Sequence, residues 1–269
     1  MTATASIRVG VGGWTFEPWR GTFFPAGLAK TKELHHASRA LDTLEINGTY
    51  YSLQRPSTFA KWRDDTPEGF VFAVKAHRLT TQRKHLGEAG ESIERFLGSG
   101  LTELGPKLGP ILWQLPNFKR FDAAEIATFF ALLPRAKDGV ALEHVLEPRH
   151  ESFKTVAFVE LARRHGIATV FTDSPEHPSF ADVTGPLVYA RLMRTRADLP
   201  DGAEPGVFTP LAACLRRWRD GGQPDGVPLV DASAAPAAKP RDVYAFFISG
   251  AKEKAPMAAM ALRRALASA

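Results

Sequence analysis

Eight short apolar segments alternate with longer segments of helical periodicity along this 269-residue chain, and no other feature limits its possible folds as much. Enrichment in Val, Ile, Leu and aromatic residues favours β-strands in the short segments. The predicted strands span residues 8–12, 43–46, 70–75, 110–115, 139–146, 167–171, 187–192 and 243–248. Strands that alternate with helices favour a parallel sheet, because a parallel connection needs a crossover of this length.

Seven helices are predicted between and after these strands, at residues 28–41, 56–65, 91–104, 122–133, 153–165, 209–220 and 251–267. Capping signals support two of them: Asp122 with Glu125 begins one helix, and Gly166 ends another. Residues 173–185 contain no convincing helix. Residues 221–242, rich in Pro and Ala, form a predicted long loop on the bottom face with room for a short strand.

These units predict one α/β domain over residues 1–269, a (β/α)8 TIM-like barrel with an eight-stranded parallel sheet. A doubly wound open sheet is the alternative. The glycine-rich turn after the first strand does not favour it, because Gly10 and Gly12 match the dinucleotide-binding pattern but Thr15 replaces its third glycine.

Charge and cysteine content narrow the class of partner and the compartment. The formal net charge is +5 and the isoelectric point about 9.4, which favours an anionic partner such as a phosphorylated metabolite or nucleic acid. Cys214 is the only cysteine, so an internal disulfide and a cysteine-based metal cluster are excluded. The N-terminal segment lacks an apolar signal core, and no apolar run is long enough to span a membrane. We therefore expect a cytoplasmic protein without a membrane partner; the oligomeric state stays open.

Polar side chains occupy the C-terminal ends of several predicted strands, where a buried parallel strand should be apolar. Because side chains alternate between the two faces of a strand, Glu45, Lys75 and Gln114 are predicted to point into the barrel. By the same alternation, Glu147 and Arg149 share the inward face. In a barrel these groups converge at the C-terminal mouth, where barrel enzymes place their sites.

A structural ion network is the alternative to a ligand site at this mouth. Glu45 would then pair with Lys75 on the adjacent strand, and Glu147 would pair with Arg149 or Arg191. Burying so many ionisable groups is costly, which favours a ligand site over a network that only fills space.

Six strings, spread in order over nearly the whole chain, resemble the YecE-like family, catalogued as domain of unknown function 72. They are VGVGGW, LEINGTYYSL, FVFAVKAHR, KLGPILWQLP, LEPRHESF and YARL. The resemblance implies a (β/α)8 barrel and a set of signature positions, but no reaction. These positions are Trp14, Glu45, Asn47, Lys75, Gln114, Glu147, Arg149, His150, Asp173 and Arg191.

The chain departs from the pattern of this family at three places near the predicted mouth. They are Gln82, Met193 and the pair Ile248-Ser249. These departures leave two interpretations open, a different substrate or a lost activity.

We predict an enzyme that acts on a small anionic ligand bearing a phosphate or a carboxylate, by acid–base chemistry without a metal or a cofactor. A hydrolase, a lyase and an isomerase all stay open. The predicted catalytic residues are Glu45, Lys75, Glu147, His150 and Asp173. The predicted substrate-binding residues are Trp14, Asn47, Tyr51, Gln114, Arg149 and Arg191.

Individual roles follow from the chemistry of these side chains. Arg149 and Arg191 would clamp the anion, because a guanidinium binds phosphate or carboxylate through two parallel hydrogen bonds. One glutamate would act as general base and His150 as acid. Lys75 would stabilise a developing oxyanion, or, if neutral, form a Schiff base.

Two other functions stay open. One is a nucleic-acid-binding or nucleic-acid-processing protein, indicated by the basic loop at residues 78–85 and by aromatic residues after the first two strands. The resemblance adds a fold-level likeness to barrel repair endonucleases, which is analogy alone. The other is a ligand-binding barrel without catalysis, which fits the three departures from the family pattern.

Overall fold

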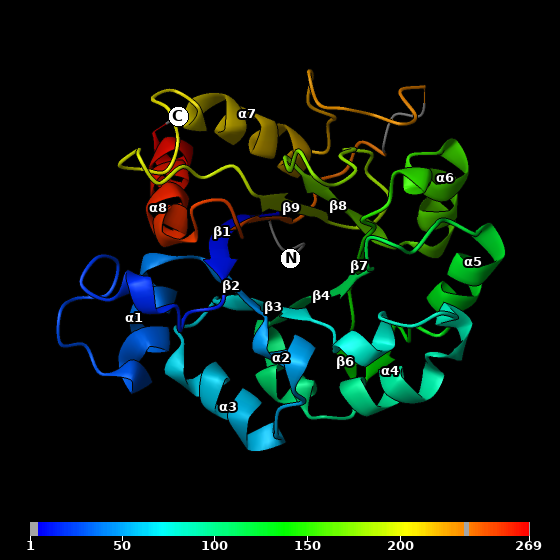
Figure 1. Cartoon of the computed structure of the whole chain (residues 1–269), viewed down its shortest axis with the longest axis horizontal. Helices are drawn as coiled ribbons and strands as arrows, with labels where there is room; N and C mark the ends of the chain where they lie inside the picture. The colour runs from blue at the N-terminus through cyan, green and yellow to red at the C-terminus, as the bar shows by residue number, and fades with distance from the viewer. Residues whose placement is uncertain (1–4, 234–236, 269) are drawn as a thin grey trace.

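A closed barrel of eight parallel strands forms the centre of the computed structural model, which describes residues 5–233 and 237–268 (Figure 1). Its strands are β1 (Ile7–Gly12), β2 (Thr43–Ile46), β3 (Val71–Lys75), β4 (Leu108–Gln114), β7 (His144–Glu147), β8 (Ala168–Thr172), β9 (Val188–Leu192) and β10 (Val243–Phe247). Neighbouring strands follow the order of the chain, and β1 pairs with both β2 and β10 to close the ring. The predicted TIM-like barrel is confirmed.

Helices surround this barrel (Figure 1). They are α1 (Glu33–Ala40), α2 (Gly48–Tyr51), α3 (Pro56–Asp65), α4 (Gly90–Leu97), α5 (Ala123–Ala131), α6 (Val156–His165), α7 (Phe208–Arg219) and α8 (Ala255–Ala267). Short 3₁₀ turns occur at Glu17–Trp19, Lys30–Lys32, Arg78–Thr80, Leu86–Glu88, Leu101–Lys107, Glu151–Phe153 and Lys252–Lys254. Among the described residues, no helix has both the length and the apolar character needed to cross a membrane.

The predicted capping residues act as expected. The Asp122 side chain accepts a 2.8 Å hydrogen bond from the Glu125 backbone N–H at the start of α5. Gly166 ends α6 with a φ of 64°, a conformation that glycine adopts without steric cost. The predicted helix 91–104 is interrupted instead. After α4 the chain turns through Gly100 with a φ of 100° and continues as a 3₁₀ turn.

The fifth predicted strand, 139–146, is wrong in its first half. The antiparallel hairpin of β5 (Ala136–Lys137) and β6 (Val140–Ala141) precedes the barrel strand, which begins only at His144. Asp138 and Gly139 turn this hairpin with φ values of 50° and 78°. An Asp-Gly pair is a common two-residue hairpin turn, so the apolar run contains a turn signal at its first glycine.

Two apolar layers lie on the two sides of the barrel wall, as the alternation of side chains predicts. Small and aromatic residues fill the inside, among them Ala73, Tyr189 and Phe246. Phe72 and Trp113, of opposite parity, pack outward against the helices. The interior layer stops below the C-terminal ends of the strands, where polar residues take over.

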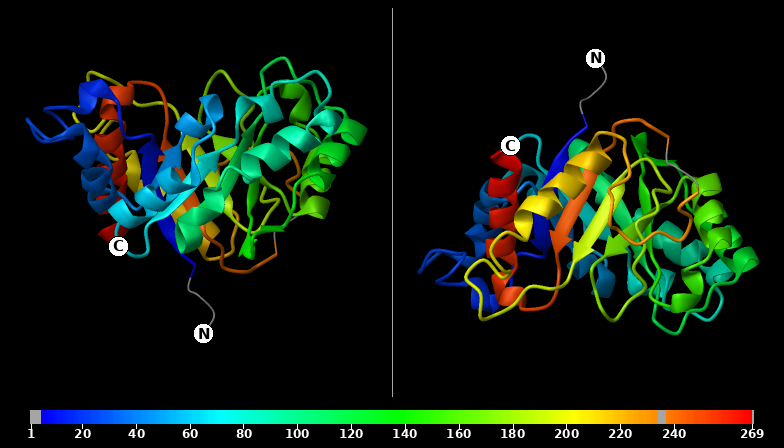
Figure 2. Two further views of the ribbon diagram at one scale, coloured as in Figure 1. Left: turned by 90° about the horizontal axis from the view of Figure 1, so that it is seen from below. Right: turned by 90° about the horizontal axis from the view of Figure 1, so that it is seen from above.

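The two segments predicted to lack helices do lack them. The chain from residue 173 to residue 187 contains neither helix nor strand. The described parts of 221–242 also form a loop without a strand, and Figure 2 shows this loop at the end of the barrel where β1 begins. The helix-free segment after β8 lies at the opposite end, beside the mouth.

Candidate functional site

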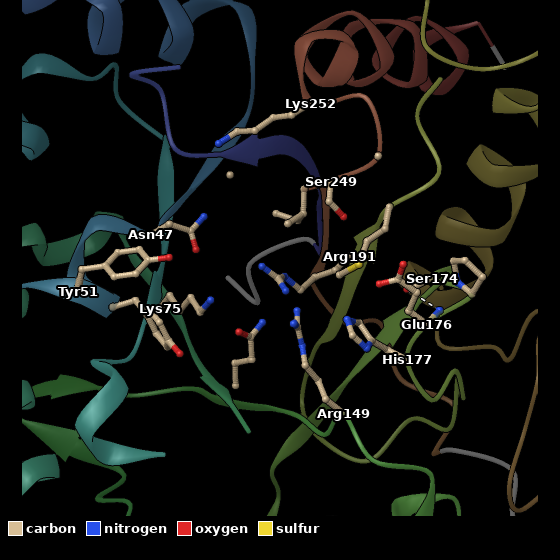
Figure 3. Close-up of a pocket in the computed structure, with 17 residues that line it drawn as sticks. Asn47, Tyr51, Lys75, Arg149, Ser174, Glu176, His177, Arg191, Ser249 and Lys252 are labelled. Carbon is tan, nitrogen blue, oxygen red and sulfur yellow. Dashed lines mark hydrogen bonds between the residues drawn. The ribbon is translucent and has the colours of Figure 1, made fainter. Parts of the chain in front are cut away.

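A cavity of about 740 Å³ opens at the C-terminal mouth of the barrel, between the ends of the strands and the loops that follow them (Figure 3). It is lined by residues at the C-terminal ends of all eight barrel strands or in the loops that follow them. Six of the predicted site residues line it: Asn47, Tyr51, Lys75, Gln114, Arg149 and Arg191.

An ion cluster centred on Arg191 forms the floor of this mouth. The Arg191 Nε and Nη2 donate to the two carboxylate oxygens of Glu45 at 3.1 and 2.9 Å. Its Nη1 donates to the two oxygens of Glu147 at 3.0 and 2.8 Å. The three side chains are at most 2% exposed. One guanidinium from β9 therefore bridges carboxylates from β2 and β7, across the width of the barrel.

Neighbouring side chains satisfy the remaining acceptors of this cluster. The Tyr189 hydroxyl donates to Glu45 at 2.7 Å, and the Gln114 amide donates to Glu147 at 2.6 Å. Arg149 donates twice to Glu147 Oε1, at 3.2 and 3.1 Å. Buried polar groups stabilise a fold only when they are hydrogen-bonded in this way.

The cluster holds the Glu147 carboxylate in the charged state. Burial by itself raises the pKa of Glu147, but the positive charges of Arg191 and Arg149 outweigh this effect and lower that pKa to about 2. Burial likewise opposes the charge of Arg191, and the carboxylates of Glu147 and Glu45 raise its pKa above the usual value. A carboxylate with a pKa near 2 and both oxygens occupied is a poor general base at neutral pH.

Lys75 lies at the same mouth without a carboxylate partner among the described residues. Its Nζ stands 4.1 Å from the centroid of the Tyr50 ring. Burial lowers its pKa from 10.5 to about 8, and the charge of Arg191 adds to that effect. The network in which Glu45 pairs with Lys75 is thus not formed, because Arg191 occupies both oxygens of Glu45.

The charges around the cavity sum to a small positive excess. Four cationic side chains line it: Lys75, Arg149, Arg191 and Lys252. Against them stand Glu176 in the lining and the two buried carboxylates Glu45 and Glu147 beneath it. Four cations against three carboxylates leave one positive charge, and Lys75 and Lys252 are the cations not held by the cluster. Such a site attracts an anion.

Five predicted site residues do not line the cavity. Glu45 and Glu147 lie in the ion cluster beneath it, and Trp14, His150 and Asp173 lie outside that cluster. Trp14 lies in the outer layer, where its ring packs edge-on against Trp62 at 5.2 Å. His150 holds the turn after β7, its Nδ1 accepting from the Ser152 backbone N–H at 3.1 Å. Asp173 accepts from the Met193 backbone N–H at 2.6 Å and so ties two loops together. These contacts hold the loops after β1, β7 and β8 in place around the mouth.

Several lining residues were not singled out from the sequence. His177 comes from the helix-free segment after β8, and its Nδ1 is buried with no partner among the described residues. Burial lowers the pKa of this imidazole. The sequence does carry a signal for His177: the segment after β8 has no helix, so it is predicted to be a long loop beside the mouth. The sequence also indicates Tyr189 of the ion cluster, because Tyr189 and Arg191 are two positions apart on one strand and therefore point to the same face.

Two of the three departures from the family pattern lie in the cavity wall. Met193, Ile248 and Ser249 all line it, whereas Gln82 does not. Among the described residues, no group of three or more His, Cys, Asp or Glu side chains is arranged to hold a metal ion.

Comparisons with known proteins match this chain along its length. The sequence model of a family described as "Protein of unknown function DUF72" matches residues 8–269. The UPF0759 protein YunF of Bacillus subtilis is 28% identical over 115 residues, 41% of this chain and 40% of that protein. The UPF0759 protein YecE of Escherichia coli K12 is 26% identical over 110 residues, 41% of this chain and 38% of that protein. The aligned stretch spans about two-fifths of the length of these relatives.

Solved structures share the fold. A DUF72 family protein from Thermotoga maritima superposes with a TM-score of 0.74 at 21% identity, covering 97% of this chain and 99% of that one. The structure of SacUVDE superposes with a TM-score of 0.51 at 12% identity, covering 96% and 99%. At these identities the likeness concerns the barrel architecture alone.

Proposed function

This chain belongs to the DUF72 family, and on that premise we propose that it is an enzyme acting on a small phosphate- or carboxylate-bearing substrate at the barrel mouth. The observation that carries the proposal is Lys75, a largely buried amine without a carboxylate partner among the described residues, facing a cavity with an excess of positive charge. Burying an unpaired amine is costly, and a ligand anion offsets that cost.

The proposed chemistry centres on proton transfer by Lys75. A pKa of about 8 lets this amine hold a proton at neutral pH and release it within a catalytic cycle. In the charged form it stabilises a developing oxyanion, which is the role we favour over Schiff-base formation. His177 also lines the cavity, and because burial lowers its pKa, its neutral imidazole is a second group that can accept a proton.

The ion cluster supports this chemistry indirectly. Arg191 is engaged by two carboxylates, so we assign it to holding the site in shape and not to clamping the substrate. Arg149 lines the cavity, is 24% exposed in its side chain and donates to Glu147 through Nε and Nη2, so it is the guanidinium that we assign to the anion.

A phosphate titration tests the proposal. Isothermal titration calorimetry with inorganic phosphate at pH 7 is expected to give binding that weakens about tenfold or more in Lys75→Met and in Arg149→Met. Lys61→Met removes an exposed lysine on α3 that has no part in the mouth, and it should leave the affinity unchanged. Raising the pH through 8 should weaken binding in the parent protein, because Lys75 loses its charge.

Either of two results would contradict the proposal. One is the absence of phosphate binding at millimolar concentration. The other is an affinity that is the same in Lys75→Met as in the parent protein, with both proteins folded by circular dichroism.

A nucleic-acid partner is the second candidate, supported by an exposed aromatic side chain at the mouth. Tyr51 is 72% exposed, and exposed aromatic rings can stack on bases. Binding of single-stranded oligonucleotides should then fall steeply with salt concentration. A flat salt dependence in a fluorescence-anisotropy titration would eliminate this candidate.

A further inference from the structure

A second cavity, of about 420 Å³, adjoins the mouth between α2, the 3₁₀ turn Arg78–Thr80 and α4. The two cavities share one residue, Tyr51, which stands at the edge of the mouth cavity (Figure 3). A ligand longer than a simple anion would therefore pass from one cavity into the other along this ring.

The second cavity carries two large side chains that are exposed to solvent. Tyr51 and Leu79 both line it, and they are 72% and 52% exposed. Large apolar side chains left exposed together beside a cavity mark a surface that a partner covers. The Tyr51 ring already packs edge-on against Tyr50 at 5.0 Å, so its position is set before any ligand arrives.

The polar groups of this cavity are balanced in charge, unlike those of the mouth. Arg95 and Glu91, one turn apart on α4, contribute one charge of each sign. The Nδ1 of His77 accepts from the Leu79 backbone N–H, and burial lowers the pKa of this imidazole, so it adds no charge at neutral pH. The cavity therefore suits a neutral, planar group with donors and acceptors on its edge.

We infer that one ligand of the nucleotide class occupies both cavities, with its phosphate in the mouth and its base in the second cavity. The inference rests on the proposed function, since it takes the phosphate site at Lys75 and Arg149 as given. A planar base can stack on the aromatic ring of Tyr51 or on the guanidinium of Arg95. The carboxylate of Glu91 can accept a hydrogen bond from the exocyclic amine of the base.

Calorimetry with inorganic phosphate, adenosine and adenosine monophosphate tests this inference. Adenosine monophosphate should bind about tenfold or more tightly than phosphate, because its base adds stacking on aromatic side chains to the phosphate contacts. Leu79→Ser and Arg95→Gln should each remove most of that advantage and leave the affinity for phosphate within about twofold. Such a ligand could be a free mononucleotide or the 5′ end of a nucleic acid, and a trinucleotide with a 5′-phosphate distinguishes the two. A site for nucleic-acid ends binds the trinucleotide as tightly as the mononucleotide, whereas a site for free nucleotides binds it more weakly.

Phe118→Ser is the matched control. This substitution also removes an exposed apolar side chain after a barrel strand. Because Phe118 does not line the second cavity, the variant should still bind adenosine monophosphate more tightly than phosphate. If adenosine monophosphate binds no more tightly than phosphate, or if its advantage survives in Leu79→Ser, the inference is wrong and the proposed function stands. If neither phosphate nor adenosine monophosphate binds, both fail.

Discussion

At the scale of single residues, two cations at one barrel mouth have opposite electrostatic surroundings. Arg191 is bridged by Glu45 and Glu147, whose carboxylates raise its pKa although burial opposes its charge. For Lys75, burial outweighs the nearby charges of Glu45 and Glu147 and lowers its pKa to about 8. The first arrangement contributes to holding the strands together, whereas the second weakens the fold in the absence of a ligand. A destabilising charge of this kind is typical of functional sites.

Lys75→Met is therefore expected to stabilise the protein. A pKa lowered from 10.5 to about 8 means that the folded state disfavours the protonated amine, at a cost of about 3 kcal/mol near neutral pH. Between pH 8 and 10.5 the unfolded chain still holds this proton and the folded chain does not, so stability rises with pH across that window. Urea denaturation of parent and variant should show a gap of about 1–3 kcal/mol at pH 7 that closes by pH 10.5.

Lys61→Met is the control for that measurement. This exposed lysine pairs with Asp65 at 2.7 Å on the surface of α3, and such pairs contribute about 0–1 kcal/mol. If Lys75→Met lowers the free energy of unfolding at pH 7, the charged Lys75 side chain does not destabilise the folded protein, and this prediction is wrong.

At the scale of elements, a glycine in β1 sets how closely two barrel strands approach each other. A Cβ atom added at Gly10 would stand 1.9 Å from the Thr43 carbonyl oxygen on β2. That contact is with backbone, so it cannot be relieved by rotating a side chain. The glycines of VGVGGW therefore serve, in part, the packing of the barrel wall, and they are not a dinucleotide-binding turn.

Gly10→Ala is expected to destabilise the protein by more than about 3 kcal/mol, because β1 and β2 must separate to admit the methyl group. Gly48→Ala, in the helix after β2, meets nothing within 4 Å and should be neutral or stabilising by about 0.5–1 kcal/mol. Thermal unfolding followed by circular dichroism compares the two variants. Equal melting temperatures would show that the barrel wall yields at this position.

At the scale of the whole molecule, the barrel closes through strands from the two ends of the chain. The β1–β10 register runs from Ile7 against Val243 to Val11 against Phe247. The Trp19 indole also donates to the Lys252 carbonyl at 2.9 Å, which joins the first loop to the last. Because the core is not complete until β10 pairs, no part of the barrel is expected to be stable alone.

We therefore expect residues 1–269 to unfold as one domain. Differential scanning calorimetry should give one transition, with a heat-capacity change of about 3–4 kcal/mol/K for a chain of 269 residues. The van't Hoff and calorimetric enthalpies should agree if that transition is cooperative. Two resolved transitions would contradict a single domain.

The sequence by itself determined the barrel and the inward direction of its polar residues. Both follow from local properties, the alternation of strands with helices and the two-residue period of each strand. This alternation places Glu45, Lys75, Gln114 and Glu147 at the mouth, and the structure has them there. The hairpin before β7 was missed because an apolar run obscured the turn at Asp138.

Only the tertiary structure decided which charges pair. The Arg191 guanidinium reaches Glu45 from 146 positions away and Glu147 from 44 positions away, and it leaves Lys75 unpaired by any described carboxylate. Periodicity states which face of a strand a residue occupies, but pairing depends on the positions of strands around a closed ring and on side-chain length. Tertiary packing likewise decided the place of Trp14, whose ring packs edge-on against Trp62 of α3 in the outer layer.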